Sequence, residues 1–137
     1  EERYSKSTDL VDEILNISPL SIEAFYLKSL LLCQNESYVK SLVYLEKIIS
    51  LGRPDASVYS QRGIVFLGLN SLNEAISSFQ KSIELDPLNI DYYKLRSESF
   101  IMNNDIDSAI DSITETLNIF PEDVDSQKRL KSILKTD

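Results

Sequence analysis

The sequence predicts an all-α fold in which antiparallel helix pairs stack side by side into a solenoid. A pattern of bulky, small and turn residues in Ala56–Asn89 returns before and after this stretch at a spacing of 34 residues, without gaps. Within each copy the apolar residues follow helical spacing. Residues that favour helix N-termini recur at the same places. Repetition, periodicity and caps therefore all indicate one helix–turn–helix unit.

The 34-residue spacing divides a single domain, residues 1–137, into units. Three complete units cover residues 22–55, 56–89 and 90–123. Residues 1–21 match the second helix of an upstream unit, with a helix from about Tyr4 to Ile17, and residues 124–137 are expected to form a capping helix. Because the first helix of the upstream unit is missing and residue 1 is not methionine, we expect the native chain to extend further toward its N-terminus.

Each unit places a small residue between two large ones on its first helix, and a small residue before a large one on its second. The first-helix sets are Phe25, Ser29 and Leu32, then Tyr59, Gly63 and Phe66, then Tyr93, Ser97 and Phe100. The second-helix pairs are Ser41 and Leu45, Ala75 and Phe79, and Ala109 and Ile113. A small residue opposite a large one lets two helices approach closely, so these positions are predicted to form the core.

Good N-capping residues precede the predicted helices of every unit. Those before the first helices and the capping helix are Ser21, Asp55, Asn89 and Asp123, and those before the second helices are Ser37, Ser71 and Asp105. Ser71 and Glu74 also match a capping box, in which each side chain satisfies a backbone amide of the other residue. The helix boundaries are therefore expected close to these residues.

The turns between helices repeat less faithfully than the caps. Asn70 and Asn104 suit a left-handed backbone position between paired helices, and Glu36 stands at the same place in the first unit, where it is a departure. The first unit also ends differently, because Gly52 and Pro54 occupy the region where the later units have a single proline. We therefore expect a different corner between the first and second units.

The central unit resembles a tetratricopeptide repeat. The 34-residue family pattern W-x2-L-G-x2-Y, A-x3-F and P is matched in kind at five of seven positions. The corresponding residues are Tyr59, Arg62, Gly63, Phe66, Ala75, Phe79 and Pro87, of which Arg62 departs from the pattern. The resemblance implies a right-handed α-solenoid of tetratricopeptide repeats that acts as a non-catalytic scaffold or adaptor for protein–protein interaction.

Helical wheels of the first helices place, opposite the core, a side that we expect to face a concave groove. The candidate partner-binding residues there are Glu23, Tyr26, Leu27, Leu30, Cys33, Gln61, Ile64, Leu67, Asp91, Lys94, Leu95, Glu98, Ile101 and Met102. Half of this side is apolar, which favours a bound partner over a bare surface. Two alternatives remain: these apolar side chains contact neighbouring units, or another segment of the same protein covers the groove.

The partner expected in this groove is an amphipathic helix or an extended peptide. Its apolar side chains are predicted to contact Leu30, Ile64, Leu67 and Ile101. Its lysines or arginines are predicted to meet the acidic positions Glu23, Asp91 and Glu98, on a chain whose net charge is -8. Apolar contacts would set the affinity, and the exposed charges would mainly set the rate and the choice of partner.

The resemblance also implies a test for chaperone binding. Members of the family that bind the acidic tails of Hsp70 or Hsp90 use a dicarboxylate clamp of Lys, Asn and Arg side chains. The matching positions here are Tyr26, Leu30, Gln61, Asp91 and Leu95. These residues do not form the clamp, and Asp91 would repel a carboxylate. A co-chaperone that binds by another mode remains an alternative function.

Three basic residues recur at the 34-residue spacing beside the core positions. They are Lys28, Arg62 and Arg96. Their place on the helical wheel indicates side chains that pack with their aliphatic stems and pair with acids such as Asp86 or Glu84. We therefore interpret them as structural residues and not as a binding stripe.

Composition excludes several functional classes. A net charge of -8 and a pI near 4.6 disfavour binding to nucleic acid or to anionic membrane, and no apolar run is long enough for a membrane span. The chain has no histidine and one cysteine, Cys33, so it has no internal disulfide and no assembled nucleophile–base pair. We expect no enzyme activity, no metal and no cofactor, and an intracellular, cytoplasmic location.

Two further possibilities remain open from the sequence. The first alternative is that the chain is a regulatory or targeting domain of a larger enzyme whose catalytic part lies elsewhere. Self-association through the open N-terminal end or the groove is also possible, because the missing upstream helix would leave an inner face uncovered.

Overall fold

The computed structural model describes residues 2–52 and 54–135, and over this part of the chain it is built from eight α-helices without strands. The helices are α1 (Glu2–Ile17), α2 (Ile22–Gln34), α3 (Tyr38–Ser50), α4 (Ala56–Gly68), α5 (Leu72–Leu85), α6 (Ile90–Met102), α7 (Ile106–Ile119) and α8 (Val124–Leu134). The predicted all-α solenoid is confirmed.

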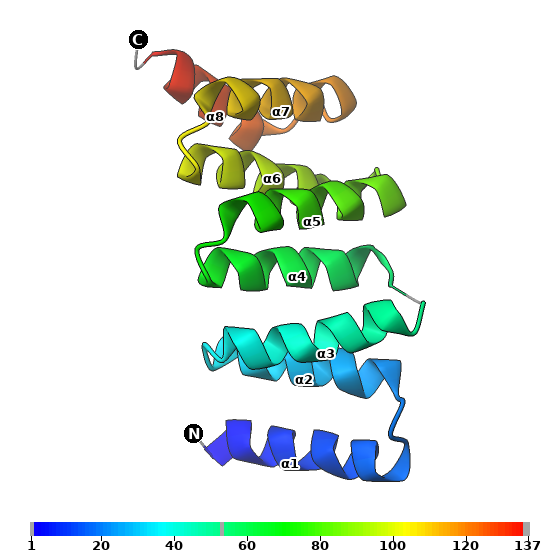
Figure 1. Cartoon of the computed structure of the whole chain (residues 1–137). Coiled ribbons are helices and arrows are strands. Elements are labelled where there is room, and N and C mark those ends of the chain that lie inside the picture. The colour runs from blue at the N-terminus through cyan, green and yellow to red at the C-terminus, as the bar shows by residue number, and fades with distance from the viewer. Residues whose placement is uncertain (1, 53, 136–137) are drawn as a thin grey trace.

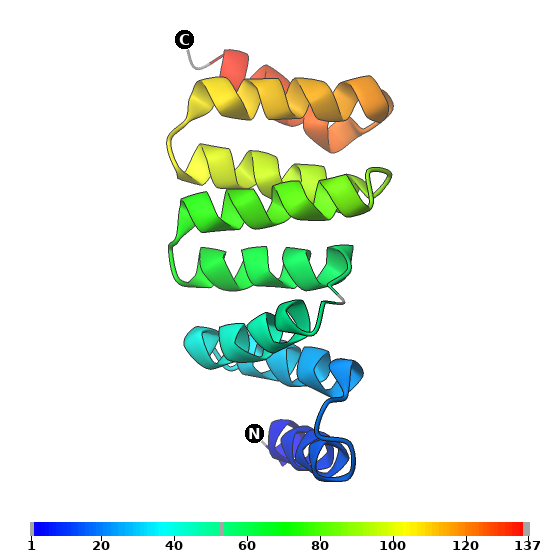
Figure 2. The ribbon, with the colours of Figure 1, turned by 45° about the vertical axis from the view of Figure 1, so that its right-hand side comes forward.

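The helices form one elongated stack in chain order. Each helix packs against the next, and the two termini lie at opposite ends (Figure 1, Figure 2). Contacts also join α2 to α4, the first helices of neighbouring pairs. Because each helix contacts only its close neighbours in sequence, folding of the stack depends on contacts between adjacent units.

Helix starts follow the repeat spacing seen in the sequence. The helices α2, α4, α6 and α8 begin at intervals of 34 residues, and so do α3, α5 and α7. The N-terminal helix α1 begins at Glu2, two residues before the expected start, and ends at Ile17 as expected. A single residue of α1, Val11, is buried, because α1 contacts a helix on one side only.

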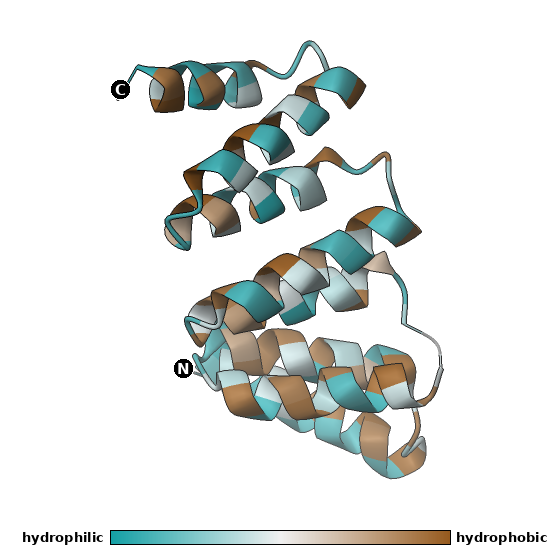
Figure 3. Cartoon of the chain, turned by 45° about the horizontal axis from the view of Figure 1, so that its top comes forward, coloured by the Kyte–Doolittle hydropathy of each residue, from teal (hydrophilic) through white to brown (hydrophobic). Residues whose placement is uncertain are grey.

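Small residues allow close approach between paired helices. A methyl group added to Gly63 would lie 2.6 Å from the ring of Phe79, which is fully buried. In the first pair, the Ser41 hydroxyl donates to the carbonyl oxygen of Ser29 over 2.7 Å, and both residues are buried. Hydrophobic and hydrophilic residues alternate along the helices (Figure 3). Most of the predicted core positions are buried and bring the helices together. Four of the predicted large residues are only half-buried, namely Leu32, Tyr59, Phe66 and Phe100.

Side-chain caps fix most of the helix starts. The side chains of Ser21, Asp55, Asn89 and Asp123 accept hydrogen bonds from backbone amides at the starts of α2, α4, α6 and α8. Asp105 caps α7 in the same way through the Ser108 amide. These five N-caps confirm the prediction and each typically contributes about 1 kcal/mol.

The predicted capping box at Ser71 is wrong. Ser71 makes no side-chain hydrogen bond at the start of α5, and Ser37 makes none at the start of α3. Ser71 and Asp105 have nearly the same backbone angles, with ψ of 75° and 77°. The carboxylate of Asp105 is one atom longer than the hydroxyl of Ser71, so at this ψ it reaches the amide and the serine does not.

All three turns between paired helices use a left-handed residue. The φ angles of Glu36, Asn70 and Asn104 are 56°, 56° and 57°. Glutamate is the least suited of the three, because its Cβ approaches the following carbonyl oxygen in this conformation.

Glu36→Gly is therefore expected to raise the free energy of unfolding by about 1 kcal/mol, as measured by urea denaturation. A matched Glu74→Gly change within α5 should instead lower it by about 1 kcal/mol.

The corner after α3 differs from the later corners, as predicted. The helix α3 has 13 residues and is followed by Gly52 with φ of 72°, whereas α5 and α7 each have 14 residues. Glycine adopts this left-handed conformation without steric cost, so the chain turns one residue earlier.

Candidate functional site

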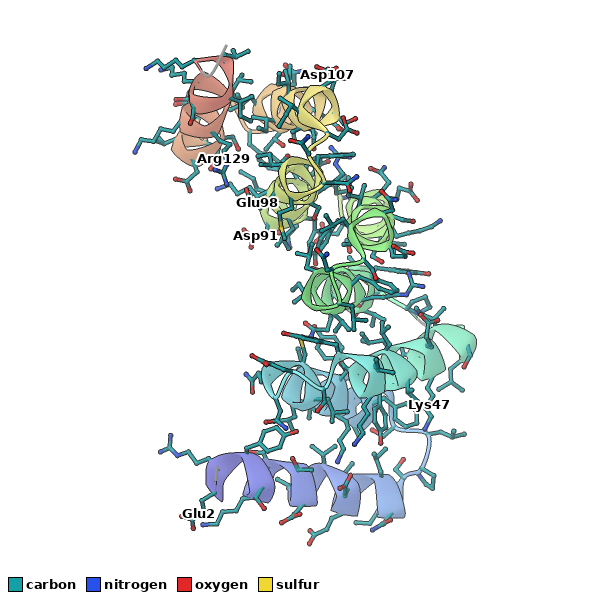
Figure 4. All side chains as sticks on the ribbon, turned by 60° about the vertical axis from the view of Figure 1, so that its left-hand side comes forward. Glu2, Lys47, Asp91, Glu98, Asp107 and Arg129 are labelled. Atoms are coloured by element: carbon teal, nitrogen blue, oxygen red, sulfur yellow. The ribbon has the colours of Figure 1, made fainter. Side chains whose placement is uncertain are left out.

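The stack bends, and the first helices α2, α4 and α6 lie on the inner side of the bend (Figure 4). The labelled residues Asp91 and Glu98 of α6 lie on this side together with Arg129 of α8, whereas Lys47 of α3 lies on the opposite side. The sequence predicted that certain positions of α2, α4 and α6 face a groove, and we call this set of positions the inner face. The structure thus places the residues of this set on neighbouring parallel helices.

Exposure on the inner face is uneven. One large apolar side chain is exposed on each first helix, namely Leu27 at 46%, Ile64 at 37% and Met102 at 49%. Glu23 and Asp91 are also exposed. The half-buried members are Tyr26, Leu30, Cys33, Leu67, Lys94, Leu95, Glu98 and Ile101. Three of the four expected apolar anchors therefore have part of their surface covered by the protein itself, and Ile64 is the exposed one.

Gln61 does not lie open on the inner face. It is buried at 7% exposure, and its side chain hydrogen-bonds with the thiol of Cys33 on α2. Burial raises the pKa of the Cys33 thiol, and the bond from Gln61 opposes this in part. The neighbouring first helix α2 contacts α4, so it covers a residue that a wheel of α4 alone assigns to the open side. Gln61 positions the α2–α4 contact and offers no free surface.

The C-terminal helix α8 occupies the charged end of the inner face. Lys94 pairs with Asp123 at 2.8 Å and with Asp125 at 3.2 Å, and Glu98 pairs with Arg129. Sequence reasoning missed these pairs, although Lys94 and Asp125 share the 31-residue spacing of Glu98 and Arg129. A partner's basic residue would therefore compete with Arg129 for Glu98.

A pocket of about 170 Å³ lies beside these ion pairs, between α6, α7 and α8. It is lined by Lys94, Ser97, Glu98, Ile101, Ile113, Asp125, Ser126 and Arg129. The two isoleucines give it an apolar part, and the paired charges and two serines line the rest. The pocket therefore joins the third unit of the inner face to the start of α8.

The Lys94–Asp123 pair gives the docking of α8 a dependence on pH. The hydrogen bond from Lys94 lowers the pKa of Asp123 from its usual 3.8 to about 2, and the bond to Asp123 raises the pKa of Lys94. Because the folded pKa of Asp123 is lowered, its contribution is present above about pH 4 and is lost as the pH falls toward 2. The contribution of Lys94 is lost only at alkaline pH, above its usual range.

We expect the native chain to lose about 1 kcal/mol more stability between pH 4 and pH 2 than the variant Asp123→Asn. Asparagine keeps the N-cap of α8 but cannot form the ion pair. Urea denaturation of both proteins at the two pH values measures the difference. Equal losses would show that the ion pair contributes nothing to the docking of α8.

The three recurring basic residues are structural, but their partners are not the acids named from the sequence. Lys28 pairs with Asp12 at 2.6 Å, Arg62 with Glu46 at 2.7 Å, and Arg96 with Glu115 at 2.5 Å. Asp12 and Glu46 each lie 16 residues before their partner, on the second helix of the preceding pair. Arg96 instead pairs forward with Glu115 of α7, and it donates back to Gln80 of α5. None of the three basic residues pairs with Asp86 or Glu84.

Among residues 2–52 and 54–135, no cluster of histidine, cysteine and acidic side chains could hold a metal ion. In the same part of the chain, no helix combines the length and the apolar character that crossing a membrane requires.

Comparison with known proteins shows the fold. No protein-family model matches the sequence, and no curated protein matches it. Among solved structures, MamA 41-end from Desulfovibrio magneticus RS-1 is 24% identical, with a TM-score of 0.80 over 90% of this chain and 70% of the other. YrrB, described as a TPR protein with an unusual peptide-binding site, is 15% identical, with a TM-score of 0.79 over 98% and 70%. The Arabidopsis OM64 TPR domain is 19% identical, with a TM-score of 0.71 over 83% and 94%.

Proposed function

Because the chain has the tetratricopeptide-repeat fold that its sequence pattern predicted, we propose that it is a non-catalytic protein-interaction scaffold whose inner face binds a segment of a partner protein. The observation that carries this proposal is the exposed apolar side chain on each of three neighbouring first helices, Leu27, Ile64 and Met102. The description of YrrB as having a peptide-binding site supports a binding role for this fold. The units are proposed to begin with α2, α4 and α6, and α8 is proposed to act as the cap.

The exposed apolar residues suggest an oblique path for the partner. Counted from the start of each first helix, Leu27 is the sixth residue, Ile64 the ninth and Met102 the thirteenth. With a rise of about 1.5 Å per residue, each successive contact lies further along its helix. A helix or extended peptide that crosses α2, α4 and α6 obliquely would therefore meet all three side chains.

Charge on the inner face favours a basic segment over an acidic tail. Asp91 and Glu23 are exposed, and Asp91 stands at one of the positions where the family's clamp would hold a carboxylate. A partner's lysine or arginine would find both acids accessible, whereas Glu98 is held by Arg129. We therefore propose an apolar and basic partner segment, bound without a dicarboxylate clamp, inside the cell.

Affinity capture on the immobilised chain tests the inner-face proposal. The double variant Leu27→Asp, Ile64→Asp is expected to lose the partner proteins that the native chain retains, because two carboxylates would have to be buried against apolar side chains. Both residues are exposed, so the fold should survive. Ser77→Asp, on the outer side of α5, is the matched control and should retain the same partners. If the double variant retains them as well, the inner face is not the binding surface.

A second candidate function, self-association, is favoured by α1. Its face and the following turn expose Leu10 at 59%, Ile17 at 86% and Leu20 at 69%. A second copy of the chain could cover these residues. Sedimentation equilibrium that shows a strict monomer at high concentration would exclude this candidate and leave the scaffold proposal untouched.

A further inference from the structure

The outer face of α3 differs in chemistry from the equivalent face of every other second helix. At three positions in register, α3 has Val39, Val43 and Lys47, α5 has Asn73, Ser77 and Lys81, α7 has Asp107, Asp111 and Glu115, and α1 has Ser5, Asp9 and Glu13. All of these residues are exposed, and the two valines of α3 are 67% and 51% exposed. Comparison of the equivalent positions of α1, α3, α5 and α7 therefore shows that, among these four helices, α3 alone has a large apolar side chain there.

The hollow beside this face is likewise lined by different residues from the equivalent hollow beside α7. Between α2 and α3 it is an open depression of about 360 Å³, lined by Lys28, Leu32, Lys40, Val43 and Tyr44. The equivalent hollow between α6 and α7 is lined by Arg96, Phe100, Ser108, Asp111, Ser112 and Glu115. The lining thus changes from polar and acidic beside α7 to apolar and basic beside α3.

Two lysines of α3 have no carboxylate partner in the described part of the chain, Lys40, which lines the hollow, and Lys47, one turn of helix beyond Val43. Among the described residues, no ion pair is formed by Lys40 or by Lys47, and the Lys47 Nζ instead lies 5.4 Å and 4.9 Å from the ring centroids of Phe25 and Tyr44. Lys28 is already neutralised by Asp12. Glu36 is the nearest acid in sequence to Lys40 and lines a neighbouring hollow with it. On a chain of net charge -8, this face is locally positive.

We propose that the outer face of α3, together with the hollow lined by Leu32, Lys40, Val43 and Tyr44, is a second docking surface for an acidic, apolar segment of a partner protein. An apolar side chain of the partner packs against Val43, Leu32 and Tyr44. Its neighbouring carboxylates accept hydrogen bonds from the ammonium groups of Lys40 and Lys47. The equivalent face of α7 repels the same segment through Asp107, Asp111 and Glu115, so docking is confined to the first unit.

This surface is independent of the inner face and has the opposite charge preference. Lys47 lies on the other side of the stack from Asp91 and Glu98 (Figure 4). One scaffold would therefore hold a basic partner segment on its inner side and an acidic one on its outer side.

Amide chemical-shift mapping tests the proposal with a defined probe, an acetylated and amidated peptide of alternating leucine and glutamate. On the ¹⁵N-labelled chain, this peptide is expected to shift amides of α3 and the C-terminal half of α2. Val43→Asp, which installs the residue found at the equivalent place in α7, should weaken binding about tenfold or more. Ser77→Asp introduces the same carboxylate at the equivalent place in α5 and should leave the affinity unchanged.

Several results would overturn the proposal. They are shifts confined to α2, α4 and α6 inner-face residues, no shifts at millimolar peptide, and equal weakening by Val43→Asp and Ser77→Asp. If the α3 amides shift with protein concentration in the absence of peptide, the face binds a second copy of the chain. If the chain co-sediments with phosphatidylserine vesicles, the face binds a membrane. A thermal melt controls for folding. The double variant Lys40→Ser, Lys47→Ser, at two exposed positions, gives a second test if Val43→Asp unfolds the chain.

Discussion

Replacing Phe79 with alanine is expected to lower the free energy of unfolding by about 3 to 5 kcal/mol. Phe79 has no exposed surface, and its ring fills the space left open by Gly63 on the facing helix. Among the described helices, the contact of α4 with α5 is the most extensive. Because they lie in the middle of the stack, a cavity there weakens the coupling between the N-terminal and C-terminal units.

Urea denaturation followed by circular dichroism measures this effect. Phe66→Ala is the matched control, since Phe66 is a half-buried phenylalanine on α4 whose ring lies 4.9 Å from the Arg62 guanidinium. The control should lose clearly less stability than Phe79→Ala. An equal loss, or a loss below about 1 kcal/mol for Phe79→Ala, would contradict the packing described between α4 and α5.

Replacing Arg96 with alanine is expected to cost about 2 to 3 kcal/mol of stability. The side chain is 7% exposed, and its guanidinium donates to Ser112, Gln80 and Glu115 over 3.0, 2.5 and 2.5 Å. Truncation removes these hydrogen bonds and the packing of the aliphatic stem. The loss stays below that of a fully buried ion pair, because Glu115 is about half exposed and regains water when its partner is removed.

Arg62→Ala provides the comparison, because its side chain is 27% exposed and pairs with a half-exposed Glu46. We expect this variant to lose about 1 kcal/mol. If the basic residues instead formed a ligand-binding stripe, both arginine variants would change partner capture and leave the unfolding transition in place.

The repeat made most of the fold predictable from the sequence. Helix starts are set by caps and by apolar spacing, which are local properties, so Ser21, Asp55 and Asn89 could be identified without a structure. The predicted capping box at Ser71 was wrong for a local reason as well. Whether its hydroxyl reaches the backbone amide depends on a ψ angle that the sequence does not specify.

The candidate site was less predictable, because exposure depends on neighbouring helices. A wheel of α4 assigns Gln61 to the open side, yet α2 covers it. The pairing of Glu98 with Arg129 depends on how α8 docks, and the sequence of α6 alone contains no signal for it. The partners of Lys28 and Arg62 became clear only when the preceding second helix was in place.

Site-specific photo-crosslinking tests the central proposal, that the inner face binds a partner, most directly. A photoreactive phenylalanine analogue placed at Ile64, on the exposed inner side of α4, is expected to capture the partner segment in the native cell. The same analogue at Ser77, on the outer side of α5, is expected to give no adduct of the mass found at Ile64. A partner adduct at Ser77 with none at Ile64 would contradict the proposal and move the binding surface to the outer face of the stack.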